Sequence, residues 1–529
     1  MRVGVLIDSA SLPRWAHVVV ADLTTSEQAR LVLVVRNGGG ASVRVRRSLF
    51  AAYEALDRRF SRAPDDYAEP VDSAALLEGC ENLTVVPQRR GEVEELSATD
   101  IEAIRAHDLD VLLQLGFGRL EGRVLGAARY GVWLLWHDEL ERRGVPPLFW
   151  EMLRGDPAVE TRLEAHTPDG PRLLYRSAAS MERSSLYLNR NAAYWKSSAF
   201  VTRALRSLET GRPALLPTVG ATERLPARTP NAFETLRFAA TTAARILRNR
   251  MQMRGARCEW FLALRTKGGP PWRTPPPWGF EELVNPRGRF RADPFLFLSD
   301  GGTWLFFEEA EFATEKGVIG CMEIGPDGTC SEVGVVLERD YHLSYPFVFE
   351  WEGAHYMIPE TSENRTIELY RATDFPRRWE LEKVLFHDVF AVDTTLLEAD
   401  GRFWLFSAMS EAGGSGNDEL FLFHADSPLG AWTPHPSNPI VSDVRCARPA
   451  GRVFRQDGAW IRPGQDCSSS YGAAIQLQRI EVLNEREYRE VPIGRIDPNW
   501  APSLVATHTI DEDGGLAVID GRRWMPRNS

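Results

Sequence analysis

Cysteine is scarce in this sequence: there are six in 529 residues, and no two of them form a Cys-x-x-Cys pair. They stand at positions 80, 258, 321, 330, 446 and 467. This scattered spacing excludes the usual zinc-ligand patterns and gives no disulfide framework. We therefore expect reduced, mostly buried thiols, and no metal site is predicted.

Long apolar runs and basic blocks are also missing. No stretch reaches the roughly 18 consecutive apolar residues of a membrane-spanning helix. The formal net charge is −11 without a long Lys/Arg run, which argues against a nucleic-acid partner. Met1–Asp8 is typical of a strand entering a fold, because its apolar run is too short for a signal peptide. The sequence therefore predicts a cytoplasmic protein and leaves peripheral contact with a membrane surface open.

Residues 1–205 alternate strand-like and helix-like segments, and a chain of this length is expected to hold at least two domains. The expected strands are Val3–Ile7, Leu31–Val35, Leu83–Val86, Val111–Leu115 and Val132–Trp136, with helices at Ser48–Arg59 and Ala98–His107. This alternation predicts an α/β domain with a mostly parallel sheet. No Gly-x-Gly-x-x-Gly follows the first strand, and Gly38–Gly40 lacks the Lys of a phosphate-binding loop.

The most informative pattern is a repeat within residues 258–529. Each copy is a short apolar strand, a Gly turn and a second apolar strand. Four clear copies begin near Asp293, Tyr345, Asp393 and Arg448, and a weaker fifth runs from Ala501 to Gly521. Starts about 50 residues apart are typical of propeller blades. The chain is therefore predicted to be multidomain, an α/β domain followed by an all-β, five-bladed propeller. The strand starts should face one central channel.

Residues 206–257 are interpreted as a Pro-rich linker and a bridging helix. Asn231 is placed to cap a helix from Ala232 to about Met253. Its apolar residues at helical spacing are Phe233, Leu236, Ala240, Ala244 and Leu247. Five arginines leave two interpretations, a solvated bridging helix or contact with an anionic membrane; the narrow, Ala-rich apolar face favours the first. Cys258–Arg265 is then expected to be a strand that closes the last blade.

The segment from residue 108 to 156 resembles the N-terminal catalytic domain of formyltransferases that use a folate cofactor. The match rests on a strand, a Gly turn and the family's spacing at Gly144, Pro147, Trp150 and Gly155. The resemblance implies His137 as the catalytic histidine, with Asp138 as a second candidate. Leu135 replaces the asparagine that polarises the formyl oxygen in that family, so a folate-type formyl donor is not expected. Alternatively, His137 is a strand-end histidine bonded to Asp138 or Glu139.

The setting Ala292-Asp-Pro-Phe295 resembles that of five-bladed propeller sugar enzymes, such as arabinanases, xylosidases, invertases and levansucrases. Chemistry at an anomeric carbon needs one carboxylate that attacks or activates water and a second, protonated one that donates to the leaving oxygen. The resemblance implies catalytic roles for Asp293 as nucleophile or base, Glu360 as acid and Asp393 as the group that orients the sugar. Tyr345 departs from the pattern, because those enzymes have an acid on blade two.

Further polar residues are predicted to bind substrate: Arg291, Glu308, Tyr345, Arg365, Arg448, Asp466 and His508. Arg448 suits a phosphate, carboxylate or nucleotide group, so a nucleotide sugar is a candidate donor. A strand-start acid can instead be tied to the backbone amides of a neighbouring blade, so each single acid also has a purely structural interpretation.

The propeller half more closely resembles the N-terminal domain of plant glucosamine inositolphosphorylceramide transferases, and bacterial proteins that join this propeller to a formyltransferase-like domain. The residues that carry this resemblance include Ala292–Phe295, Ser344–Phe347, Pro359–Glu360, Val392–Thr395 and Val518–Arg522. In the plant proteins, glycosyl transfer is expected to belong to a separate domain of another fold. The resemblance therefore implies a glycan or glycolipid partner without fixing the reaction.

Three functions follow as hypotheses. The first is a glycosyltransferase-type enzyme of glycan or glycolipid biosynthesis that binds its sugar in the propeller channel. The second is a formyl or acyl transferase that acts on an amino sugar through the N-terminal domain. The third is a non-catalytic glycan-binding protein. Transfer is preferred to hydrolysis, because a protein expected in the cytoplasm is better suited to building a glycan than to digesting one.

Overall fold

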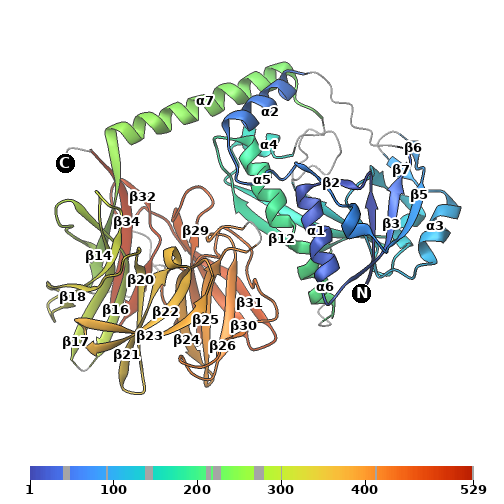
Figure 1. Cartoon of the computed structure of the whole chain (residues 1–529). Coiled ribbons are helices and arrows are strands. Elements are labelled where there is room, and N and C mark those ends of the chain that lie inside the picture. The colour runs from blue at the N-terminus through green and yellow to red at the C-terminus, as the bar shows by residue number, and fades with distance from the viewer. Residues whose placement is uncertain are drawn as a thin grey trace. The chain divides into compact units, whose positions relative to one another are not determined.

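A computed structural model describes residues 1–39, 48–90, 93–137, 147–209, 228–266, 279–299, 301–411 and 414–526, together with the backbone of 216–217. The chain divides into two compact units, Met1–Arg248 and Asn249–Ser529. Figure 1 draws the first in blue to green and the second in green to red. Each unit has its own sheets and its own apolar cores.

One eight-stranded sheet organises the first unit, in the order β13-β12-β11-β10-β8-β1-β3-β5. The five expected strands all form: β1 Arg2–Ile7, β3 Arg30–Asn37, β5 Glu81–Val85, β8 Val111–Gln114 and β10 Val132–Trp136. They are parallel, and their order counted along the chain is 3-2-1-4-5, a doubly wound arrangement. The sequence analysis missed the other edge, where β11 Ala158–Thr167, β12 Gly170–Ser180 and β13 Leu216–Pro217 run antiparallel.

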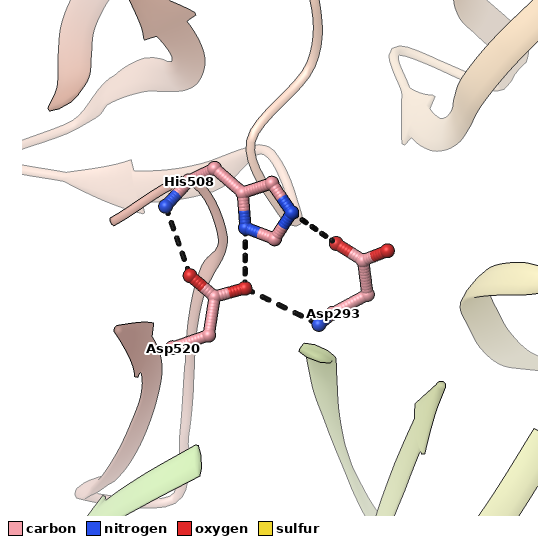
Figure 2. A group of neighbouring side chains, drawn as sticks. All are labelled: Asp293, His508 and Asp520. Carbon is pink, nitrogen blue, oxygen red and sulfur yellow. Dashed lines mark hydrogen bonds and ion pairs between the residues drawn. The ribbon is translucent and has the colours of Figure 1, made fainter. Parts of the chain in front are cut away.

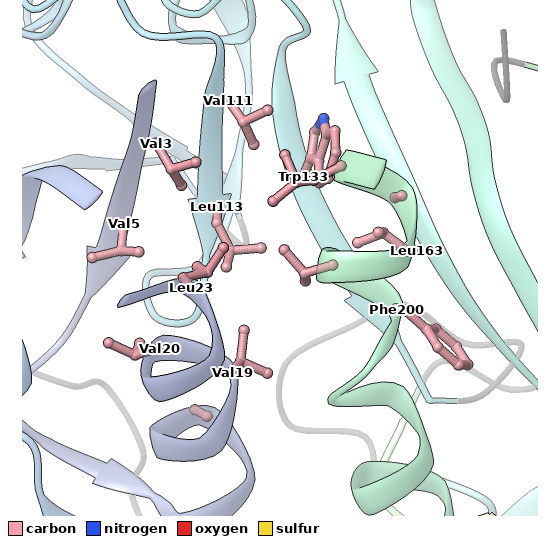
Figure 3. Packing of buried hydrophobic residues seen from close by; sticks show 14 of the residues in the cluster. Val3, Val5, Val19, Val20, Leu23, Val111, Leu113, Trp133, Leu163 and Phe200 are labelled. Atoms are coloured by element: carbon pink, nitrogen blue, oxygen red, sulfur yellow. The ribbon is translucent and has the colours of Figure 1, made fainter. Parts of the chain in front are cut away.

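Helices cover this sheet: α1 Arg14–Thr25, α2 Leu49–Phe60, α3 Ala98–Arg105, α4 Phe149–Arg154, α5 Leu186–Ser197 and α6 Phe200–Glu209. Smaller sheets pair β2 Ser11–Pro13 with β4 Pro70–Asp72, and β7 Val93–Glu95 with β6 Gln88–Arg90 and β9 Arg119–Leu120. Against α1 and α6, Val3, Val5 and Trp133 pack with Val19 and Phe200 (Figure 3). A second core lies on the opposite face, so the parallel strands are apolar on both sides, as their sequences indicate.

The long helix α7 spans Ala232–Gly255, and the boundary between the two units falls inside it. Asn231 Oδ1 accepts the N–H of Glu234 at 2.9 Å, and the Glu234 carboxylate accepts the N–H of Asn231 at 2.8 Å. This capping box confirms the predicted start of the helix. Its buried residues are Thr235, Phe238 and Thr242. The apolar spacing seen in the sequence lies on the exposed side, because Phe238 anchors the helix against Tyr53 and Phe149.

The second unit is built from five antiparallel sheets that form the blades of a β-propeller (Figure 1). Blade one is β16 Arg289–Ser299, β17 Gly302–Glu311, β18 Gly317–Ile324 and β19 Cys330–Leu337. Blade two is β20 Ser344–Trp351, β21 Ala354–Thr361, β22 Thr366–Asp374 and β23 Arg378–His387. Blade three is β24 Ala391–Ala399, β25 Arg402–Met409, β26 Leu420–Ala425 and β27 Thr433–Pro434. Blade four is β28 Phe454–Gln456, β29 Ala459–Asp466, β30 Ala474–Leu483 and β31 Tyr488–Ile496.

The fifth blade combines both ends of this unit. The C-terminal hairpin of β33 Ile510–Asp513 and β34 Leu516–Pro526 pairs with the N-terminal strand β14 Ala256–Arg265, which is followed by β15 Glu281–Leu283. A short strand, β32 Leu504–Ala506, also pairs with β34. The pairing of β14 with β34 confirms that the segment from Cys258 to Arg265 closes the last blade. A blade shared in this way holds the first and last strands of the propeller together.

All six cysteines are free thiols. Only Cys321 and Cys467 are buried, and the other four are partly exposed, which corrects the expectation of mostly buried thiols. Cys258 and Cys330 are near the starts of β14 and β19.

Candidate functional site

The starts of the first strands share an unusual backbone. Asp293, Tyr345 and Asp393 have φ values of 51°, 45° and 52°, and each lies at a break in the register between the first and second strand of its blade. A residue with a side chain rarely adopts a left-handed conformation, so three equivalent occurrences mark a repeated structural device. The alignment of these three positions in the sequence is thereby confirmed.

The fifth blade contributes His508 to the same set of positions. Asp293 stands two residues before Phe295, which pairs with Phe306, and His508 stands two residues before Ile510, which pairs with Ile519. Arg448 comes from the start of blade four, one residue before the bridge between Pro449 and Gly464. One ionisable or hydroxyl-bearing side chain is thus supplied by each of the five blades.

Arg448 and Asp393, two of the five strand-start residues, form a bidentate ion pair. Arg448 Nε donates to Asp393 Oδ2 at 2.6 Å, and its Nη2 donates to Asp393 Oδ1 at 3.1 Å. The same Nη2 lies 3.3 Å from a carboxylate oxygen of Glu360, and Gln465 Nε2 donates to Asp393 at 2.6 Å. Burial raises the pKa of Asp393 to about 7 in spite of the Arg448 charge. The Asp393 carboxyl therefore lies close to its protonation midpoint at neutral pH.

His508 connects the remaining strand-start acid to a second carboxylate (Figure 2). Its Nδ1 is 2.5 Å from Asp520 Oδ2, and its Nε2 is 3.5 Å from Asp293 Oδ1. Thr509 Oγ1 donates to Asp293 Oδ1 at 2.7 Å. Burial opposes the imidazolium charge, but Asp520 and Asp293 raise the pKa of His508 above its ordinary value. Burial likewise raises the pKa of Asp293 to about 6, and His508 limits the rise.

Asp520 was not among the candidates from the sequence. Its carboxylate also accepts the N–H groups of His508 at 2.9 Å, Thr509 at 3.1 Å and Asp293 at 3.2 Å. It lies on the second strand of its blade, whereas the sequence analysis searched the first strands. The only signal was its place in Val518–Arg522, which carries part of the family resemblance.

Two glutamates occupy matching positions on the second strands of blades one and two. Glu308 pairs with Ala292, and Glu360 pairs with Ser344. Burial and the nearby carboxylates, Asp293 first among them, raise the pKa of Glu308 well above its ordinary value, and His342 Nε2 lies 3.4 Å from it. Glu360 contacts Arg448, and Ser362 Oγ donates to it at 2.7 Å. The surroundings of Glu308 therefore favour its protonated form.

Tyr345 has a structural role among the five strand-start residues. Its ring is fully buried, and its hydroxyl accepts the N–H of Gly451 at 2.8 Å and lies 2.9 Å from Thr395 Oγ1. These contacts link blades two, three and four. The hydroxyl is engaged by the scaffold, which favours a structural role for Tyr345.

An aromatic wall adjoins His508. Trp260, from β14, stacks on the imidazole with ring centres 4.0 Å apart, and Tyr471 meets it edge-on at 5.3 Å. The Arg448 guanidinium lies 5.0 Å from the centre of the Tyr471 ring. Tyr471 is 37% exposed, so this side chain borders solvent.

Three predicted substrate-binding residues make their contacts elsewhere. Arg291 pairs with Glu309 at 2.7 Å and Glu332 at 2.9 Å, in a cavity of about 270 Å³ on blade one. Arg365 is exposed in the turn after β21 and donates to the carbonyl oxygen of Asp388. Asp466 pairs with Arg495 at 2.5 Å. Their recorded partners are not the strand-start residues.

In the first unit, His137 directly follows β10 and is buried. Its ring stacks on Tyr194 at 3.7 Å, meets Trp15 at 5.4 Å, and its Nε2 is 2.8 Å from Ser197 Oγ. Burial lowers the pKa of His137 to about 3, so it is neutral under physiological conditions. Leu135 packs against the sheet core. Asp138, Glu139 and Gly144 lie outside the described residues, and the formyltransferase-like function stays a prediction.

Within the part of the chain that the structure describes, one group of side chains has the donors for a metal ion. The ligand atoms of Asp293, His508 and Asp520 lie within 4.8 Å of one another. Carboxylate oxygens and an imidazole suit several divalent ions. In the geometry described here, however, these atoms already satisfy one another as an ion pair and hydrogen bonds, so the cluster is explained without a metal.

Comparison with known proteins finds a family model that matches most of the propeller. Residues 282–497 match the family model described as glucosamine inositolphosphorylceramide transferase 1, N-terminal. This stretch covers blades one to four and thus Asp293, Glu308, Glu360, Asp393 and Arg448.

The relatives are plant proteins. Glucosamine inositolphosphorylceramide transferase 1 of Oryza sativa subsp. japonica is 43% identical over 252 residues, which are 44% of this chain and 33% of the rice protein. The protein of the same name from Arabidopsis thaliana is 42% identical over 208 residues, 39% of this chain and 27% of that protein. The chain thus spans about a third of the length of the curated relatives it matches.

Solved structures offer a distant likeness. Zg3597, a family 117 glycoside hydrolase of Zobellia galactanivorans, has a TM-score of 0.34 at 13% identity, covering 50% of this chain and 90% of that one. The α-L-arabinanase of Cellvibrio cellulosa has a TM-score of 0.30 at 14% identity, covering 37% and 76%. The five-bladed architecture rests on the strand pairing given above. Among the described residues, no helix is long and apolar enough to cross a membrane.

Proposed function

We propose that this chain is a glycosyl-transferring enzyme of glycolipid biosynthesis and that its propeller channel binds the sugar. The observation that carries the proposal is the proximity of four acids from three blades, Asp293, Glu308, Glu360 and Asp393, two of which pair with Arg448 from blade four. The sequence relation to plant transferases named for glucosamine and inositolphosphorylceramide supports a glycolipid acceptor.

The proposed chemistry uses two carboxyl groups in different protonation states. Asp293, whose pKa is about 6, is ionised at neutral pH and serves as the base or nucleophile. Glu308, whose pKa burial raises well above the ordinary value, serves as the proton donor to the leaving oxygen. Such a separation of two neighbouring pKa values is how acid and base roles are assigned in sugar chemistry. Glu308 thereby takes the role that the sequence analysis gave to Glu360.

Arg448 is proposed to recognise an anionic part of the substrate. A guanidinium binds phosphate through two parallel N–H groups, and both a nucleotide sugar and an inositol phosphate headgroup carry phosphate. A substrate phosphate would compete with Asp393 for these N–H groups, and Asp393, with a pKa of about 7, would take up a proton as it is released. Tyr471, which is 37% exposed next to Arg448, offers an aromatic side chain that the sugar can contact.

A second candidate, a non-catalytic glycan-binding protein, is favoured by one observation. Asp393 is held by Arg448 and Gln465, and Asp293 is held by Thr509 and His508. Acids used for such bonds can shape a binding channel without reacting.

One assay separates the two candidates. The full chain is incubated with a panel of nucleotide sugars and with inositol phosphorylceramide or oligosaccharides as acceptors. We expect turnover that Glu308→Gln lowers by about 10²–10⁴-fold, the usual contribution of a general acid, and that Asp293→Ala abolishes. His137→Ala should leave turnover unchanged, as the matched control in the first unit. Saturable sugar binding without turnover supports the second candidate, and unchanged turnover in the Asp293 variant removes the propeller from the chemistry.

A further inference from the structure

Helix α7 exposes its more apolar face. Phe233 is 73% exposed, Leu236 and Leu247 are each 59% exposed, and Met251 is 65% exposed. Ala240 and Ala244, which lie between them on the same stripe, are also exposed. At about 3.6 residues per turn these six residues line one side of a 24-residue helix. Four large apolar side chains on one exposed stripe are typical of an interaction surface.

The opposite face fixes which way this stripe points. Thr235, Phe238 and Thr242 are buried, and Phe238 packs 4.7 Å from Phe149 between ring centres. Arg245 Nη1 donates to the carbonyl oxygen of Met152 at 3.4 Å. The helix therefore cannot turn its apolar stripe into the core of the first unit without losing these contacts.

The charges beside the stripe have one sign. From Thr235 to Gly255 the helix carries five arginines and no acidic residue, although the whole chain has a net charge of −11. Four of the five are exposed. At about 100° per residue, Arg237 and Arg248 flank one side of the stripe, and Arg250 and Arg254 flank the other. An apolar stripe bordered on both sides by cations is the arrangement that lies in the interface of an anionic bilayer.

We propose that this outward face of α7 binds an anionic membrane surface, with the helix lying in the plane of the interface. Charge complementarity selects this partner, because a second copy of the helix would place arginine rows against each other. The inference rests on the proposed function in one respect: a glycolipid acceptor resides in a membrane, and α7 would hold the enzyme beside it.

The test is co-sedimentation of the full chain with vesicles of phosphatidylcholine alone and of phosphatidylcholine containing phosphatidylserine. Binding is expected only to the anionic vesicles, and it should weaken on raising NaCl to about 1 M, where the Debye length is about 3 Å. The double variant Arg248→Gln/Arg250→Gln should lower the partition coefficient by about fivefold for each arginine removed. The double variant Leu236→Asp/Leu247→Asp should lower it further.

Two controls keep the result interpretable. Val284→Asp changes an apolar residue that is 83% exposed outside α7 and should bind vesicles as the unchanged chain does. Asp293→Ala should also bind them, so failure of sugar turnover and failure of membrane binding are separate outcomes. Equal binding to neutral vesicles, no binding to either kind, or a dimer in light scattering that the leucine variants abolish would each overturn the proposal.

Discussion

Two histidines in this protein are buried to a similar degree and have opposite electrostatic properties. His508 is 2% exposed in the propeller, between Asp520 and Asp293, and its pKa is raised. His137 is 8% exposed at the end of β10, between Tyr194 and Trp15, and burial lowers its pKa to about 3. Burial alone removes charge from an imidazole, whereas carboxylates placed against it preserve the charge.

This difference separates a candidate site from a packed core. Around His508, acids from several blades interact with one another and with cationic side chains. A charged group of a ligand can therefore replace one of these partners. Around His137, the contacts among the described residues are with two aromatic rings and one serine hydroxyl. A histidine at a strand end is therefore weak evidence of function unless ionisable partners surround it.

The largest effect is expected from His508→Phe. This change removes the imidazolium between Asp293 and Asp520 and leaves the two buried carboxylates with hydrogen bonds but without that charge. Breaking a buried pair in this way costs about 3–5 kcal/mol of unfolding free energy. Urea unfolding at pH 7 measures it, and a loss below about 1 kcal/mol would show that His508 is neutral in the folded protein.

Arg448→Met should cost somewhat less, about 3 kcal/mol, because Asp393 can take up a proton when its partner is lost. The matched control is Arg462→Met in blade four, which breaks a buried pair with Glu490 that has no contact with the strand-start acids. Both variants should be destabilised, but only the Arg448 variant should lose binding to nucleotide sugars in calorimetric titration. Equal binding by the two variants would contradict the role given to Arg448.

Propeller stability should fall as pH rises from about 5 to 8. Asp293 and Asp393 have pKa values of about 6 and about 7 in the folded protein, above the ordinary 3.8, and the pKa of His508 is also raised. Each group holds its proton more tightly when folded, so its contribution is complete at low pH and is lost as pH passes its folded pKa. The slope per group is at most about 1.4 kcal/mol per pH unit.

Asp393→Asn tests this pH dependence directly. The variant should show a smaller slope of unfolding free energy against pH between about 5 and 8. An unchanged slope would place the titration on other groups.

The smallest effect is expected from His137→Phe. The new ring keeps the stacking on Tyr194, and Ser197 Oγ still donates to the carbonyl oxygen of Tyr194 at 2.9 Å. The loss of one neutral hydrogen bond should cost about 0.5–1.5 kcal/mol, with no dependence on pH between about 5 and 8. A pH-dependent loss in thermal unfolding would mean that His137 titrates and has an ionisable partner.

Much of the fold could be predicted because its signals are local. Gly turns between apolar strands recur in four clear copies, and an aligned position becomes the same left-handed residue in three blades. The parallel strands of the first unit are continuous apolar runs. The hairpin of β11 and β12 was missed because charged residues interrupt the apolar pattern of its first strand. These residues, Glu160, Arg162 and Glu164, form ion pairs in the fold.

The site was less predictable, because its groups meet only through the closure of the propeller. Asp520 lies on β34, and its partner Asp293 is 227 residues away in the chain. Helix α7 shows a similar limit, because its sequence contains two apolar faces. The buried face is the one with Phe238 and the threonines Thr235 and Thr242. Helical spacing identifies a stripe but does not say what covers it.

The most direct test of the central claim is a crystal structure of the chain soaked with a nucleotide sugar or with a glycosylated inositol phosphate headgroup. The sugar should lie in the propeller channel, with its hydroxyl groups within hydrogen-bond distance of Asp293 and Glu308 and its phosphate on Arg448. Sugar bound in the first unit beside His137, or a channel left empty with the Arg448–Asp393 pair unchanged, would contradict the account.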